Sequence, residues 1–271
     1  TLYREVNLIK ENFKKVSDAL PDVYLAAEFI NDHFDQLITI SLKNDNPSDW
    51  QFASLLMVFG SHHSWIHSYI NTSIGFSDLG WMSLRRSIEF VCYLSKIKNS
   101  DKRAKLWMSK GESLKNRKEF SNVFSVPRKY FNEKYSYLKT LLVLHDYASD
   151  YGTHANFEVL MNKYDVEEEK QKYIVSFQDI KKNIDTSLGM VLLSGYRILQ
   201  CIIRILETEI HNYKVFSKNF ENASESIRKA RLKIADREFN GNIPVEVAKN
   251  INSDNEDAIE EKYQVLIDSY K

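Results

Sequence analysis

The chain has 271 residues, of which 43% are hydrophobic and 27% are charged, a composition typical of a globular protein with a substantial core. Lysine plus arginine and aspartate plus glutamate each number 37, so the formal net charge is zero. This balance removes the general electrostatic argument for a nucleic acid or an anionic membrane as partner. No run approaches the roughly 20 apolar residues of a membrane span. We therefore expect a cytoplasmic protein that does not bind a membrane.

Helix-type spacing of apolar residues fills the long intervals between the few glycines and prolines. The fold class expected is all-α, a multi-helix bundle of long antiparallel helices. Two cysteines, Cys92 and Cys201, lie inside these apolar patterns and are expected to be buried free thiols. In the first half of the chain the pattern predicts helices at about 23–42, 49–74 and 77–99, and a further helix that starts after Ser100.

In the second half, a loop is expected around 121–130, followed by a helix over about 129–150 and a short helix over about 155–164. Residues 172–178 alternate in polarity, which indicates one short strand or one arm of a hairpin. The strongest helical pattern runs over about 180–211 and predicts a central helix. A last helix is expected over about 258–270, after an interruption at 240–257.

The simplest division of the chain is a helical bundle over residues 1–213 and a helical carboxy-terminal extension over 214–271. In the extension, Phe220, Ala223, Ile227, Ala230 and Ile234 recur at alternating steps of three and four residues. Such a narrow seam is suited to packing along one other helix. The extension therefore packs either on its own bundle or on a partner, and the second alternative predicts a homo-oligomer.

The stretch SLRRSIEFVCYL, residues 83–94, places charged residues in a helix that is apolar on two sides. Projected at about 100° per residue, Arg85, Arg86 and Glu89 fall in one sector between the apolar arcs. Both arginines are within reach of Glu89 along the helix. The stripe is either the water-facing edge of the bundle or a partly buried polar seam. In the second case it needs partners on neighbouring helices, and Tyr147, Asp150 and His154 are the candidates.

These two segments carry a resemblance. LRRSIEFVCYL together with YASDYGTHANF resembles the Arg-Ser-x-x-Glu and Tyr…His motifs of an uncharacterised family of helical bacterial proteins, grouped loosely with HEPN-type bundles. The residues that match are Arg86, Ser87 and Glu89 in the first motif, and Tyr147 and His154 in the second. The resemblance implies a helical bundle and assigns no activity.

The stretch RILETEIH, from Arg204 to His211, resembles the Arg…His pair of HEPN ribonucleases. On one continuous helix, Arg197, Arg204 and His211 would share a face, with Gln200 and Glu207 between them. Such a row could hold a phosphate while His211 moves a proton. The same row is equally the solvated side of an amphipathic helix.

His63 and His67 lie one helical turn apart, a spacing at which two imidazoles can share one metal ion. The third ligand would have to come from elsewhere, with Glu89 and His154 as donors. Because two imidazoles alone make a weak site, the expectation is no metal and no other cofactor.

Two classes of function follow. The first is a non-enzymatic protein that acts through contacts with another protein or with its own copies. The second is a HEPN-like ribonuclease or a metal-assisted hydrolase in a toxin or defence system, for which a nucleic acid is a partner. Whether the protein is an enzyme depends on whether Arg204 and His211 line one cleft or lie on open surface.

Overall fold

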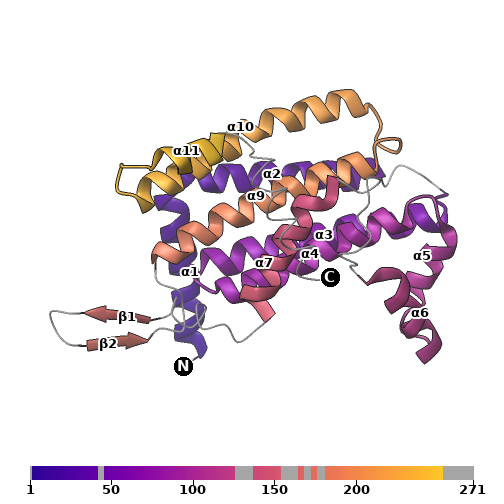
Figure 1. Ribbon diagram of the computed structural model, residues 1–271, viewed down its shortest axis with the longest axis horizontal. Helices are drawn as coiled ribbons and strands as arrows, with labels where there is room; N and C mark the ends of the chain where they lie inside the picture. The colour runs from indigo at the N-terminus through magenta and orange to yellow at the C-terminus, as the bar shows by residue number, and fades with distance from the viewer. Residues whose placement is uncertain are drawn as a thin grey trace.

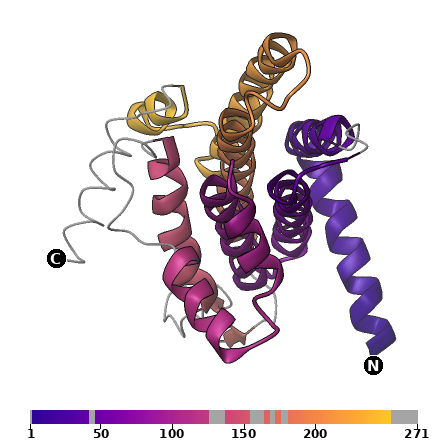
Figure 2. The same ribbon diagram turned by 90° about the vertical axis from the view of Figure 1, so that its right-hand side faces the viewer.

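The computed structural model describes residues 2–41, 46–125, 137–153, 164–167, 172–175 and 181–252. It confirms the all-α class, a bundle of helices packed on one another. In Figure 1 the long helices α2, α3, α4, α9 and α10 run alongside one another, and α5 and α6 lie at one end. Figure 2 shows α1 at an outer edge of the bundle.

The elements follow one another along the chain with short connections. They are α1 (Leu2–Ala19), α2 (Pro21–Ser41), α3 (Asp49–Ser73), α4 (Ser77–Ile97), α5 (Asp101–Met108), α6 (Leu114–Phe124), α7 (Lys139–Thr153), β1 (Tyr164–Glu167), β2 (Lys172–Val175), α9 (Lys181–Ile205), α10 (Tyr213–Glu238) and α11 (Val245–Asn252).

The pair α3 and α4 is held together at close range by small side chains. Ser87 Oγ donates to the Ser61 carbonyl at 2.8 Å, and the two hydroxyls lie 3.0 Å apart. A glycine at position 60 leaves room for the ring of Phe90. Gly75, at a φ of 85°, allows the sharp turn between the two helices. The serine of the Arg-Ser-x-x-Glu motif is therefore a buried helix contact.

The central helix α9 contacts α2, α3, α4, α7 and α10. The Trp65 indole of α3 donates to the carbonyl of Val191 at 3.1 Å and covers Gly195, where a side chain would collide with it. Within the described residues one segment, Ile184–Ile205, is long and apolar enough to span a bilayer, and most of it is buried among the other helices. That burial accounts for its apolar composition.

The seam predicted for the carboxy-terminal extension is used inside the chain. Phe220, Ile227, Ala230 and Ile234 of α10 are buried, and α10 packs on α2 and α9. The side chain of Ala223 lies outside the description. The expected use of this seam for an oligomer is wrong, because its apolar side chains already fill the core of their own bundle.

The strand expected near 172–178 is β2, which pairs antiparallel with β1, Tyr164 facing Val175 and Glu167 facing Lys172. This hairpin projects from one end of the bundle in Figure 1. The helices expected at 155–164 and 258–270 lie almost wholly outside the described residues, and so does the loop from 126 onward.

Other boundaries differ from the sequence prediction. The helix after Ser100 is two helices, α5 and α6, and Ser113 caps the second by accepting a hydrogen bond from the Asn116 amide at 3.0 Å. Helix α1 was not predicted, because charged residues dilute its apolar pattern. Helix α11 starts directly after Pro244, inside the stretch predicted to be irregular, and proline favours helix starts.

Candidate functional site

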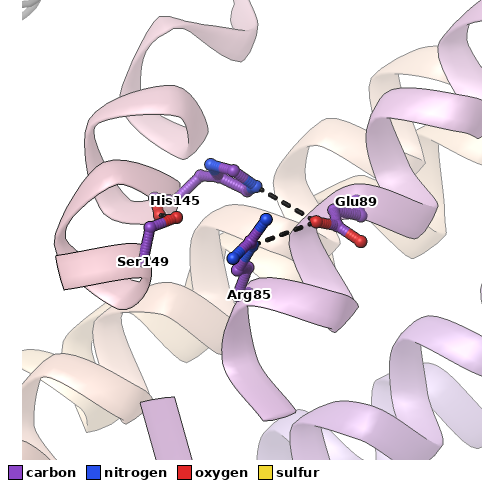
Figure 3. A network of polar contacts seen from close by, with 4 residues as sticks. All are labelled: Arg85, Glu89, His145 and Ser149. Atoms are coloured by element: carbon purple, nitrogen blue, oxygen red, sulfur yellow. Dashed lines mark hydrogen bonds and ion pairs between the residues drawn. The ribbon is translucent and has the colours of Figure 1, made fainter. Parts of the chain in front are cut away.

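The polar stripe of α4 forms a cluster with α7. Arg85 Nε donates to Glu89 Oε1 at 3.1 Å, and His145 Nε2 lies 3.4 Å from the same oxygen. Figure 3 shows both groups converging on the carboxylate from two helices. His145 is buried, while the side chains of Arg85 and Glu89 are 34% and 27% exposed. The stripe is therefore a partly buried polar seam.

The ionisation of Glu89 reflects both burial and its partners. Desolvation by burial acts to raise the pKa of Glu89, but the hydrogen bond and charge of His145, together with Arg85, outweigh it and lower the pKa. Glu89 is thus a carboxylate at neutral pH. Ser149 Oγ donates to the His145 carbonyl at 2.7 Å within α7. The cluster joins α4 to α7 and leaves no unengaged acid or base for catalysis.

The other residues predicted for this seam lie elsewhere. Arg86 is exposed and its guanidinium lies 5.8 Å from the centre of the Phe90 ring. Tyr147 is half-buried against the core, and Asp150 is exposed. His154 lies outside the described residues. His145, which sequence reasoning missed, occupies a buried step of α7 between Leu141 and Ala148. A histidine at an apolar step of a helix was the signal that it needed a polar partner.

The histidine pair of α3 is exposed, and its two Nε2 atoms lie 3.2 Å apart. The neighbouring His62 is buried and turned away, with Nε2 2.9 Å from Asn31 Oδ1. Within the described part of the chain, no group of three or more histidine, cysteine, aspartate or glutamate residues could hold a metal ion. Glu89, one predicted third ligand, is engaged by Arg85 and His145.

The largest concave feature is a cavity of about 660 Å³ between the start of α7, the second half of α9 and the start of α10. Three cationic and three aromatic hydroxyl-bearing side chains contribute to its wall. They are Lys139, Arg197, Arg204, Tyr137, Tyr196 and Tyr213. Glu207 and Glu221 also line it. The cationic groups outnumber the acids.

The arginines of α9 are held in place by neighbouring groups. Arg197 is 7% exposed, and its Nη1 donates to Gln200 Oε1 at 2.8 Å. The guanidinium of Arg204, in the last turn of α9, lies 5.0 Å from the centre of the Tyr137 ring. Such contacts fix the direction of a guanidinium and cost none of its charge. Two oriented cations, seven residues apart, therefore share one cavity wall.

The predicted row on α9 is only partly correct. Arg197, Gln200, Arg204 and Glu207 all line the cavity. His211 does not, and its expected place on the same helix face is wrong, because α9 ends at Ile205. The chain then turns, with Asn212 in the left-handed region at a φ of 55°, before α10 begins. His211 is exposed in that turn and is not among the residues that line the cavity.

Cys201 also lines the cavity, as a buried free thiol whose Sγ donates to the Tyr137 carbonyl at 3.2 Å. Burial raises the pKa of Cys201 to about 12, so it holds its proton at neutral pH and is a poor nucleophile. Cys92 is likewise buried, which confirms that both cysteines are free thiols.

Sequence reasoning missed the parts of the cavity that come from α10 and from the start of α7. Tyr137 and Lys139 lie about sixty residues before α9, and Tyr213 and Glu221 follow it. No local pattern joins these segments. Comparison of the chain with family models, with curated proteins and with solved structures finds no match.

Proposed function

We propose that the protein binds a small organic anion with a flat ring, of which a mononucleotide is the simplest example, in the cavity between α7, α9 and α10. The observation that carries the proposal is the meeting of Lys139, Arg197 and Arg204 with three tyrosines in one space of about 660 Å³. This volume falls within the roughly 300–1,000 Å³ of small-molecule sites.

Each class of side chain in the wall supports one part of this ligand. The guanidinium groups suit a phosphate or carboxylate, because arginine can donate two parallel hydrogen bonds to either. The phenol rings offer flat surfaces for stacking, and Tyr196 already stacks on Phe220 with ring centres 4.9 Å apart. Glu207 and Glu221 can accept hydrogen bonds from hydroxyl or amino groups. A nucleotide combines all three features.

The proposal is for binding without catalysis. The thiol of Cys201 stays protonated, His211 is outside the cavity wall, and the described residues form no metal-holding group. A HEPN-like ribonuclease, the second expectation from the sequence, would need Arg204 and His211 at one phosphate. The turn after Ile205 separates them, so the geometry favours binding over cleavage.

Thermal unfolding of the purified protein with adenosine monophosphate, adenosine or inorganic phosphate tests this proposal. Adenosine monophosphate should raise the melting temperature more than either fragment, because only it engages the cations and the rings together. A ligand at a hundred times its Kd stabilises the folded state by about 2.7 kcal/mol. An unchanged melting temperature with all three compounds, at concentrations up to the millimolar range, would refute the proposal.

A further inference from the structure

The outward face of α3 carries no charge. Its exposed side chains are Phe52, Leu56, Phe59, His63, His67 and Ile70. The helix contains no lysine, arginine or glutamate, and its one acid, Asp49, is the first residue. Helices that face water normally carry charged side chains on that side, and a helix without them is normally covered. This face is built for contact with another surface.

The exposed residues of α3 follow one another at steps of four, three, four, four and three. This spacing is close to the 3.5-residue period of helices that pack along each other, so the face is a narrow stripe that fits one partner helix. We call these six residues the α3 stripe. The two histidines interrupt its apolar character near the middle.

The histidine pair has the geometry of half a metal site. An ion bound tetrahedrally at about 2.0–2.1 Å from each nitrogen holds two imidazole nitrogens about 3.3 Å apart. The Nε2 atoms of His63 and His67 are 3.2 Å apart. Phe59 stacks beside His63, with ring centres 6.2 Å apart and planes at 18°, which supports the orientation of that imidazole.

The half site lacks two ligands, and the described part of the chain does not supply them. A second copy of the chain supplies the same pair. We propose that two copies pack their α3 stripes together around a zinc-like divalent cation bound by His63 and His67 of each copy. Four imidazoles complete the tetrahedral coordination that such an ion prefers. The inference stands apart from the cavity and does not depend on its ligand.

A twofold axis suits the stripe. Two copies related by such an axis present the same patch to each other, so the patch must complement itself when reversed. Measured along α3 from the midpoint of the two histidines, Ile70 lies five residues away in one direction and Phe59 six in the other. An antiparallel pair of α3 helices therefore places Phe59 of one copy beside Ile70 of the other. The formal net charge of zero adds no overall repulsion between copies.

Sedimentation of the purified full chain with zinc chloride, and separately with a chelator, tests this inference. Zinc should double the apparent molar mass, and elemental analysis of the isolated species should give about one ion per two chains. The chelator should return the protein to the monomer. Cobalt in place of zinc should give the visible absorption of a tetrahedral complex.

Variants separate the metal site from a general effect of zinc. His63→Ala with His67→Ala removes two exposed rings, so the chain should fold normally and remain monomeric in zinc. His211→Ala removes another exposed histidine outside the stripe and should leave the zinc-dependent doubling unchanged. A wild-type protein that stays monomeric in zinc would overturn the proposal. So would one ion bound per monomer, or a dimer that survives both the chelator and the double histidine variant.

Discussion

His145 of α7 and Glu89 of α4 meet at 3.4 Å, although they are separated by fifty-six positions in the chain. The acid also accepts a hydrogen bond from Arg85, so one carboxylate serves two basic groups on two helices. The presence of charged residues in an otherwise apolar helix is thus explained by packing. Glu89 is the residue through which α4 and α7 are joined by polar contacts.

Replacing Glu89 with alanine should lower the free energy of unfolding by about 2 kcal/mol, because the change leaves buried His145 and part-buried Arg85 without their shared acceptor. Urea unfolding measures the change. Glu112→Ala removes an exposed acid between α5 and α6 and should change the free energy by at most about 0.5 kcal/mol. Equal effects of the two substitutions would place Glu89 on an ordinary water-facing edge.

The same cluster predicts a dependence on pH. Burial opposes ionisation of Glu89, but His145 and Arg85 prevail and bring the pKa below its ordinary value of 4.5. A carboxylate whose pKa is lower in the folded chain stabilises the fold above the unfolded pKa, and this contribution is lost as the pH falls through the folded pKa. The stability difference between wild type and Glu89→Gln should therefore narrow below about pH 4.5. A difference that is constant from about pH 6 to about pH 3 would contradict this assignment.

The contact between Gly195 and Trp65 predicts a second stability effect. A methyl group at position 195 would collide with the indole, which is 1% exposed and cannot move aside into solvent. Gly195→Ala should destabilise the fold by about 2–3 kcal/mol through overpacking. Gly111→Ala, at a position open to solvent, should be neutral or stabilise by up to about 1 kcal/mol. Calorimetric melting of both variants tests the pair, and similar melting temperatures would disprove the tight α3–α9 contact.

The wild-type protein should not cleave single-stranded RNA in the absence of metal, because His211 lies beyond the end of α9 and outside the cavity wall that contains Arg204. Incubation of labelled RNA with the protein and a chelator measures the activity. Cleavage that is lost in both Arg204→Ala and His211→Ala, with each variant folded, would establish the ribonuclease and refute the binding proposal.

Apolar spacing predicted the fold where each helix has one clear boundary signal. Ser48 and Ser100 occupy the predicted cap positions of α3 and α5. The same spacing failed at the end of α9. Leu206 and Ile210 continue the apolar rhythm and are buried, but the backbone has already turned away from the helix. Periodicity reports which side chains are inside, and it does not report the backbone that carries them.

The candidate site was predictable only along single helices. The row from Arg197 to Glu207 follows from helical spacing, and the structure places it in the cavity wall. The phenol of Tyr137, which lies against Arg204, comes from a segment remote in sequence, and its position depends on tertiary packing. His145 was missed for the same reason, because its partner is on another helix.

Binding of adenosine monophosphate to Arg204→Ala, measured by isothermal titration calorimetry, tests the central proposal most directly. Arg86→Ala is the matched control, since both are exposed arginines over an aromatic ring but only Arg204 lines the cavity. Losing a charged hydrogen bond of about 1.5–3 kcal/mol should weaken binding by roughly tenfold to a hundredfold in Arg204→Ala, while Arg86→Ala matches the wild type. Equal affinity in all three proteins would contradict a ligand site in this cavity.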